Sequence, residues 1–244
     1  MKKILLTNDD GYNAEGIRIL YEKLQKYGEV VLVAPHNHMS GASVSRVSWY
    51  DTKVHFHEAN IYSVDGTPAD AVHYALYGLK IKPDLIVSGI NDGHNIGLDT
   101  IYSGTVGAAM EGLKGGYKAI AFSCDFKYFE PAVQDFDQVM DFILSKNLPS
   151  YDYILNVNFI SRQFTESKGI IITDLAFRPF NQYYVETEKG IFRNRRNSVP
   201  YEFIPHTDTW AAEHGYTSIT PLKLGNQTDK GLAELKKKVG TFDK

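Results

Sequence analysis

Short apolar runs alternate with segments of helical spacing through the first 160 residues, and this alternation constrains the fold more than any other feature. The expected strands are 3–7, 30–34, 61–64, 85–87, 119–122 and 153–159, and the expected helices are 17–24, 69–79, 106–113 and 133–144. Strands that alternate with helices pair in parallel, with helices on both faces of the sheet. We therefore predict an α/β fold.

The second half of the chain has a different pattern, in which strands dominate. The segments expected as strands are 170–173, 183–187, 191–194 and 218–221, and residues 188–190 carry a hairpin turn signal. We interpret residues 1–244 as one α/β domain with three parts. These are a core over about 1–160, a β-rich extension over about 169–222, and a lysine-rich tail helix over about 228–244.

Composition excludes several classes of protein. The net charge of −3 and a pI near 6.2 argue against a surface for duplex nucleic acid. A single cysteine, Cys124, excludes an intrachain disulfide and a cysteine-based zinc site. We find no apolar run long enough for a signal peptide or a spanning helix, so we expect a cytoplasmic protein without a membrane partner.

Polar, glycine-rich loops follow three of the expected strands. Asp9 and Asp10 follow the first, Ser40 lies in the loop after the second, and residues 88–99 follow the fourth. Ligands of an open parallel sheet bind at the carboxyl ends of its strands. Adjacent carboxylates repel each other unless they share a cation, and oxygen ligands suit Mg²⁺ or Mn²⁺. The alternative is that Asp9 or Asp10 only caps the following helix.

A second candidate site is the loop Ser103-Gly104-Thr105, which opens a helix. Free backbone N–H groups at a helix start bind anions, and the two hydroxyl groups could add donors. Simple capping of the helix by Ser103 is the competing interpretation, and the loop alone favours it.

The histidines form two pairs of the pattern His-x-His, at 36 and 38 and at 55 and 57. Neither pair has a nearby third ligand of the usual zinc type, so we expect His55 and His57 to be surface residues. His36 and His38 could contact a phosphate group when they are protonated.

Several ordered motifs resemble those of the SurE family, the stationary-phase survival proteins that are metal-dependent 5′/3′-nucleotidases. The motifs are Thr7-Asn8-Asp9-Asp10-Gly11, Ala34-Pro35 with Ser40-Gly41-Ala42-Ser43, Gly66-Thr67-Pro68-Ala69-Asp70, residues 88–97, residues 102–109 and residues 215–222. The stretch His36-Asn37-His38-Met39 departs from the pattern, because family members usually carry Asp and basic residues there.

The resemblance implies a Rossmann-like three-layer core with a projecting hairpin arm, assembled as dimers or tetramers. It also implies one divalent metal ion per subunit, Mg²⁺ or Mn²⁺, with Asp9, Asp10, Ser40 and Asn91 as ligands. Asn95 and the segment Ser103-Gly104-Thr105 would line the pocket for the phosphate group of a nucleotide substrate.

The leading functional prediction is hydrolysis of nucleoside 5′-monophosphates. Whether nucleoside 3′-monophosphates are also substrates is left open. A metal-activated water would attack phosphorus, with Asp9 or Asp10 as the catalytic residue that orients it. The alternative is a non-catalytic nucleotide-binding sensor, which the missing basic residue before Ser40 favours. A weaker third interpretation is a sugar-nucleotide transferase.

Overall fold

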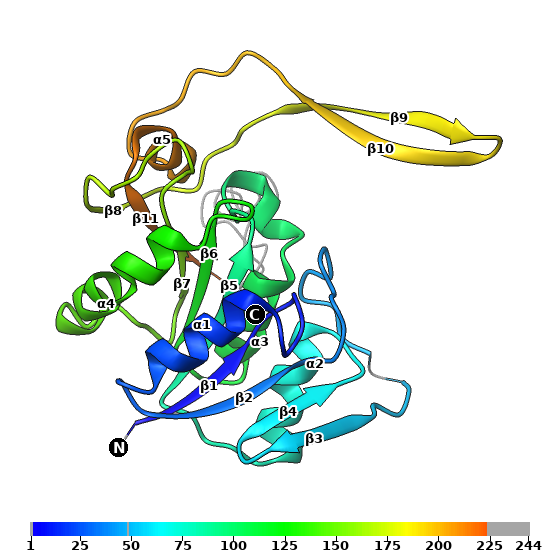
Figure 1. Cartoon of the computed structure of the whole chain (residues 1–244), viewed down its shortest axis with the longest axis vertical. Coiled ribbons are helices and arrows are strands. Elements are labelled where there is room, and N and C mark those ends of the chain that lie inside the picture. The colour runs from blue at the N-terminus through cyan, green and yellow to red at the C-terminus, as the bar shows by residue number, and fades with distance from the viewer. Residues whose placement is uncertain (1, 48, 224–244) are drawn as a thin grey trace, which may run out of the picture.

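A nine-stranded sheet runs through the molecule in the order β3-β4-β2-β1-β5-β6-β7-β11-β8 (Figure 1). The structure is a computed structural model and describes residues 2–47 and 49–223. The strands of this sheet are β1 (Lys3–Thr7), β2 (Glu29–Pro35), β3 (Val54–Glu58), β4 (Ile61–Val64), β5 (Leu85–Asp92), β6 (Ala119–Cys124), β7 (Ile154–Asn158), β8 (Ile170–Ile172) and β11 (Thr217–Leu222). The helices are α1 (Glu15–Leu24), α2 (Pro68–His73), α3 (Gly104–Lys114), α4 (Glu130–Ser145) and α5 (Asp208–His214), with a π-helix η1 (Tyr74–Gly78) and a 3₁₀ helix η2 (Gly97–Ile101).

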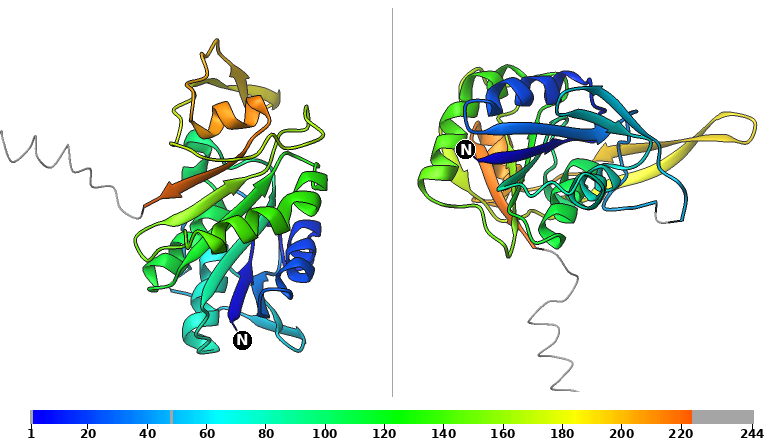
Figure 2. Two further views of the ribbon diagram at one scale, coloured as in Figure 1. Left: turned by 90° about the vertical axis from the view of Figure 1, so that its left-hand side faces the viewer. Right: turned by 90° about the horizontal axis from the view of Figure 1, so that it is seen from below.

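The six strands from β4 to β7 in this order pair in parallel, while β3 and β11 join their neighbours β4 and β7 in antiparallel fashion. Helices cover both faces of the sheet, which makes three layers (Figure 2). The α/β fold predicted from the alternating pattern is confirmed. None of the described helices is long and apolar enough to cross a membrane.

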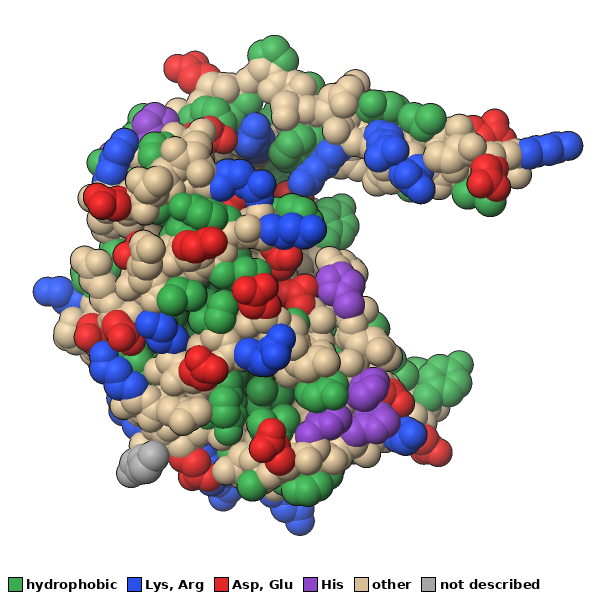
Figure 3. All heavy atoms as spheres, in the orientation of Figure 1, with side chains coloured by type: hydrophobic (Ala, Val, Ile, Leu, Met, Phe, Trp, Pro, Cys, Tyr) green, Lys and Arg blue, Asp and Glu red, His purple; other side chains and the backbone are tan. Residues whose placement is uncertain are grey.

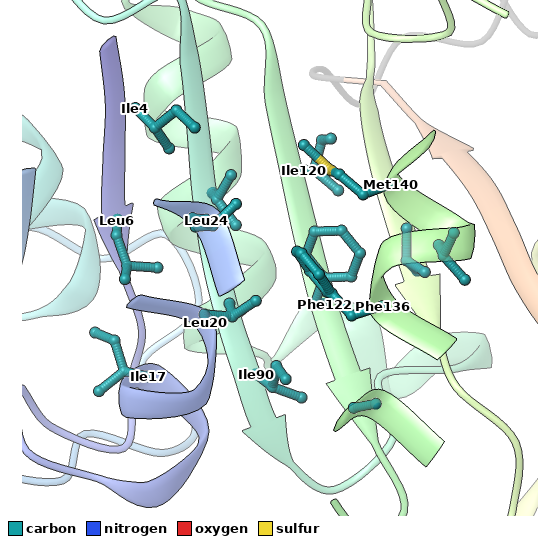
Figure 4. Packing of buried hydrophobic residues seen from close by; sticks show 14 of the residues in the cluster. Ile4, Leu6, Ile17, Leu20, Leu24, Ile90, Ile120, Phe122, Phe136 and Met140 are labelled. Carbon is teal, nitrogen blue, oxygen red and sulfur yellow. The ribbon is translucent and has the colours of Figure 1, made fainter. Parts of the chain in front are cut away.

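Alternating side chains along each strand build two cores, one on each face of the sheet. Leu6 points toward α1 and α4, while its neighbour Leu5 points toward α2 and α3. Figure 4 shows the first core, where Leu20 of α1 and Phe136 of α4 pack against residues of β1, β5 and β6. Successive strand residues face opposite sides of a sheet, so a strand covered on both faces is apolar throughout. This explains why the central strands read as continuous apolar runs.

Strands β1 and β4 coincide with the predicted ranges, and most other boundaries differ by up to three residues. The predicted ends of two strands were wrong, because β5 continues from 87 to Asp92 and the strand expected at 191–194 continues to Ser198. The expected helix 69–79 is divided into α2 and η1. A capping box between Thr67 and Asp70 stabilises the N-terminus of α2. Three elements, β3, η2 and α5, were not predicted. β3 is an edge strand with the sequence VHFHE, and its polar residues conceal the strand pattern. η2 and α5 are too short for helical periodicity to reveal them.

Residues 169–222, expected as one β-rich extension, are divided between two sheets. β8 and β11 extend the main sheet beyond β7. β11 pairs with the free edge of β7, and β8 pairs with β11. The strands β9 (Phe180–Glu188) and β10 (Ile191–Ser198) form a separate hairpin that projects from the body (Figure 1). The predicted turn at 188–190 is confirmed, with Gly190 at a φ of 77°. The expected tail helix 228–244 lies outside the described residues.

The start of α3 lies very close to the loop that follows β2. A Cβ atom at Gly107 would lie 1.9 Å from the carbonyl oxygen of Ser43, whereas one at Gly112 would meet the flexible end of the Ile86 side chain at 2.6 Å. Only a glycine at 107 permits this approach.

We predict that Gly107→Ala lowers the free energy of unfolding by about 1–3 kcal/mol, the usual cost of overpacking. Gly112→Ala is the matched control, because both changes add one methyl group to the same helix and gain the same helix propensity. Urea unfolding of the two variants measures the difference. Equal unfolding midpoints would contradict the prediction.

Candidate functional site

The chain order of the strands defines a crevice at the carboxyl ends of β1 and β5. From β1 the chain continues through α1 to β2 on one side, while β5 pairs with β1 on the other side. Connections that diverge in this way leave a gap above the sheet where ligands bind. Asp9 and Asp10 follow β1, and Asn91 is the last residue but one of β5, so these three predicted residues lie at the crevice.

Asp9 is almost completely buried, with 2% of its surface exposed. The hydroxyl group of Thr105 donates a hydrogen bond to its Oδ1. The start of α3 packs against it so tightly that a Cβ atom at Gly104 would lie 2.8 Å from the Cβ of Asp9. Burial raises the pKa of Asp9 to about 6, and the charge of Asp10 adds to this while the Thr105 hydrogen bond opposes it. When ionised, a carboxylate buried to this extent is stabilised by a positive partner, and without one it tends to take up a proton.

Asp10 lies half-buried beside it and has two fixed contacts. Its Oδ2 accepts a hydrogen bond from the backbone N–H of Asp92 at 3.2 Å, and its Oδ1 lies 3.2 Å from Nδ1 of His38. Burial raises the pKa of Asp10, although both contacts lower it. His38 is well exposed, so water screens its interaction with the two neighbouring carboxyl groups.

Asn91 and Ser40 complete the predicted set of oxygen ligands. The Nδ2 of Asn91 donates to the carbonyl group of Gly93 at 2.6 Å, and this contact leaves the amide oxygen Oδ1 available. The backbone N–H of Met39 donates to the carbonyl group of Asp9 at 2.7 Å, which holds the exposed Ser40 next to the aspartates. Carboxylate, amide and hydroxyl oxygens suit Mg²⁺ or Mn²⁺. The residues at the crevice therefore fit a divalent ion of this class.

The loop Ser103-Gly104-Thr105 has a dual role in the structure. Ser103 caps α3, with its Oγ accepting from the N–H of Val106 at 3.1 Å, as the capping interpretation expected. Thr105 donates its hydroxyl to Asp9 and so orients a carboxylate. The backbone N–H groups at the start of α3 lie against Asp9 at the crevice, where they can bind an anion.

Asn95 is buried and holds the loop after β5 in place. Its Nδ2 donates to Ser123 Oγ at 2.9 Å, and its backbone N–H donates to Asn158 Oδ1 at 2.8 Å. The side chains of Asn156 and Asn158 donate to its carbonyl group. These contacts support the loop, and a direct phosphate contact of Asn95 stays a prediction. Sequence reasoning missed Asn156 in the middle of β7 and Asn158 at its end, because an Asn-x-Asn pattern within a strand gives no signal of this role.

A cavity of about 570 Å³ adjoins the loop after β5. It lies between His94 and Ile96 of that loop, Phe126 after β6, and Phe180 and Arg196 of the hairpin. The Arg196 guanidinium lies 4.7 Å from the ring centre of Phe180 and also forms an ion pair with Asp99 at 3.0 Å. The aromatic rings suit a ligand that has a ring system. Asp99 and Asp125 also line the cavity and offset the positive charge of Arg178 and Arg196.

Comparisons with known proteins identify similar chains. The family model described as Survival protein SurE matches residues 4–182. The protein named 5′-nucleotidase SurE from Legionella pneumophila strain Philadelphia 1 is 40% identical over 229 residues, which cover 91% of each chain. Its namesake from Haemophilus influenzae strain PittEE is 39% identical over the same share of each chain. The crystal structure of SurE protein from Aquifex aeolicus aligns with a TM-score of 0.84 at 36% identity and covers 96% of this chain and 98% of that chain.

Because the pKa of Asp9 is raised, we predict that Asp9→Asn changes the free energy of unfolding in a pH-dependent way when a chelator removes metal ions. A folded-state pKa of about 6 against 3.8 means that the protein loses stability as pH rises between these values, because the buried group must ionise. Asparagine avoids this cost, so the variant gains up to about 3 kcal/mol over wild type between pH 4 and pH 7.

Urea midpoints in EDTA across this pH range measure the gain, with the exposed Asp51→Asn as the matched control. Added Mn²⁺ should reverse the order of wild type and Asp9→Asn, because the ion favours the charged carboxylate. Parallel pH curves for the two proteins would contradict the prediction.

Proposed function

The chain belongs to the SurE family, and on that basis we propose that it is a 5′-nucleotidase that hydrolyses nucleoside 5′-monophosphates to nucleoside and phosphate. The observation that carries this proposal is the pair Asp9 and Asp10 at the crevice between β1 and β5. Asp9 is buried there and contacts the start of α3. One edge of the sheet thus combines ligands for a cation with donors for an anion, which is what a phosphate ester needs. Nucleoside 3′-monophosphates are a second substrate class of the proposal.

The substrate is proposed to bind with its phosphate group at the aspartates and its nucleoside in the adjoining cavity. That cavity begins at Gly93 in the loop after β5, two residues beyond Asn91 near the end of that strand. Phe126 and Phe180 provide ring faces against which a base can stack. Arg196, held by its ion pair with Asp99, lies beside Phe180.

Asp9, Asp10, Ser40 and Asn91 would hold one Mg²⁺ or Mn²⁺ ion. When bound, such an ion stabilises negative charge on the phosphoryl oxygens and activates the attacking water. The Thr105 hydroxyl holds Oδ1 of Asp9 and the Asp92 N–H holds Oδ2 of Asp10, so both carboxylates keep a fixed orientation. One of these two carboxylates accepts the proton of the attacking water. The N–H groups that open α3 stabilise charge on the transferred group.

The first test of the proposal is metal dependence of phosphate release from nucleoside 5′-monophosphates. EDTA should abolish release, and Mn²⁺ or Mg²⁺ should restore it. Asp9→Asn should lower kcat at least about 100-fold, because it removes a ligand and a charged group at the reacting centre. Asp51→Asn, which changes an exposed carboxylate, should leave kcat unchanged.

Full activity in EDTA would contradict the metal-dependent mechanism. Tight nucleotide binding without phosphate release would instead support the non-catalytic sensor. Circular dichroism of Asp9→Asn must match that of wild type for the comparison to hold.

We further propose that the protein forms homodimers or homotetramers through the β9–β10 hairpin. Tyr184 and Phe192 lie on the same face of the hairpin, because Phe192 pairs with Glu186, and their side chains are 68% and 58% exposed. An isolated two-stranded hairpin is marginally stable in water, so apolar side chains on it favour contact with another chain. Closed symmetric oligomers are the usual outcome of self-association. The cytoplasmic location, and the lack of duplex nucleic-acid and membrane partners, stay predictions.

Static light scattering at micromolar concentration tests the assembly. Wild type should have two or four times the 27.5 kDa chain mass. Tyr184→Asp combined with Phe192→Asp should lower this mass, whereas Lys189→Ala at the exposed turn should not. A wild-type protein with the mass of a single chain would contradict the proposal.

A further inference from the structure

A second cluster of polar side chains lies at the β3–β4 end of the sheet, outside the crevice that holds the aspartates. It consists of His36, His55 and Asp65. A ring nitrogen of each histidine and a carboxylate oxygen of Asp65 all lie within 4.8 Å of one another. Nε2 of His55 is 2.9 Å from Oδ1 of Asp65. The space-filling view shows histidine side chains gathered over the β3–β4 end of the molecule (Figure 3). The cluster thus takes one histidine from each His-x-His pair and adds Asp65, ten residues after His55.

The sheet itself brings these three residues together. His36 follows β2, Asp65 follows β4, and His55 lies in β3, and these are three adjacent strands. The register pairs Ser63 with both Ala34 and His55. Side chains two residues apart share a face, so all three candidate ligands project from the same face as Ser63. Backbone hydrogen bonds of 2.8 Å from His36 to Val64 and from Asp65 to Lys53 hold this arrangement.

A second layer of contacts orients the imidazole rings. The Ser63 hydroxyl lies 2.9 Å from Nδ1 of His36 and 2.8 Å from Nε2 of His57. The ring of Tyr12 stacks on His57 at 3.9 Å and on His36 at 5.5 Å between ring centres. Metal-binding histidines commonly have such partners on the second ring nitrogen, which fix the ring orientation.

We propose that His36, His55 and Asp65 form a second metal site, selective for a borderline divalent ion of the Zn²⁺ class. Two imidazole nitrogens and one carboxylate, with a water as fourth ligand, are a donor set typical of zinc. The crevice site offers only oxygen donors and suits Mg²⁺ or Mn²⁺ instead. In a tetrahedral zinc site the ligand atoms lie about 3.3 Å apart. The His36 and His55 rings stack with their centres 4.3 Å apart, so one ring must turn for both nitrogens to face the ion.

The position of the site gives it a structural consequence. His36 begins the loop that continues to His38 and Ser40 at the crevice, and Tyr12 follows the aspartate pair. The backbone N–H of Tyr12 also donates to the carbonyl group of Pro35 at 2.9 Å. An ion at His36 therefore anchors the base of the loop that carries one of the proposed crevice ligands, without contacting the substrate.

Zinc titration of the tag-free, full-length protein in excess Mg²⁺ tests the proposal, because Mg²⁺ occupies the oxygen site. Calorimetry should detect one equivalent of Zn²⁺ for wild type. His36→Asn and His55→Asn should each weaken this binding at least about tenfold, while Asp9→Asn should retain it. His206→Asn is the matched control, since His206 is exposed and has a φ of 66° that asparagine adopts readily.

Co²⁺ as a second probe identifies the coordination. Four-coordinate Co²⁺ with nitrogen ligands absorbs visible light far more strongly than six-coordinate Co²⁺, so wild type should be coloured and His55→Asn should not. Asp65→Asn, at a partly exposed position, replaces any histidine variant that does not fold. Equal Zn²⁺ binding by wild type and the His36, His55 and Asp65 variants would overturn the proposal, as would loss of the Zn²⁺ equivalent in Asp9→Asn. The cluster would then be an ordinary His55–Asp65 ion pair.

Discussion

Burial of the Asp9 carboxylate against the start of α3 is the constraint on which the crevice depends. The carboxylate lies at the end of the central strand β1, and Gly104 permits the helix to approach it. Removal from water raises its pKa to about 6, so a charged Asp9 needs the Thr105 hydroxyl and a cation nearby. This close approach requires small residues on α3, including Gly107, which lies against Ser43. Function and packing thus constrain the same few positions.

Parallel pairing concentrates chemistry along one edge of the sheet. The ends of β1 and β5 carry oxygen donors, and the ends of β2 and β4 carry His36 and Asp65. Because parallel strands all end at the same edge, residues far apart in sequence become neighbours there. The two clusters differ in donor chemistry, and this difference gives them different metal preferences. Main-chain contacts at Met39 and Tyr12 connect them through the loop after β2.

The β9–β10 hairpin adds a second surface to this edge. Arg196 reaches from the hairpin to Asp99 at the 3₁₀ helix η2, and Phe180 lines the cavity next to the loop after β5. The hairpin therefore contributes to the proposed nucleoside pocket as well as to the proposed assembly. A projecting element of two strands can serve both purposes, because its base packs on the body while its tip stays free (Figure 1).

The alternating pattern predicted the fold class, and the residues after the first strand predicted the aspartate pair at the crevice. Apolar strands covered on both faces leave a continuous signal, and Asp9-Asp10 directly after the first strand is a local pattern, so both could be read from the chain. Contacts between distant residues were decided only by the tertiary structure. Thr105 at Asp9, His38 at Asp10, and Asp65 beside the histidines depend on strand order and register, as does the division of 169–222 between two sheets. Local periodicity carries no information about which strands become neighbours, because long-range pairing is set by how the whole core packs.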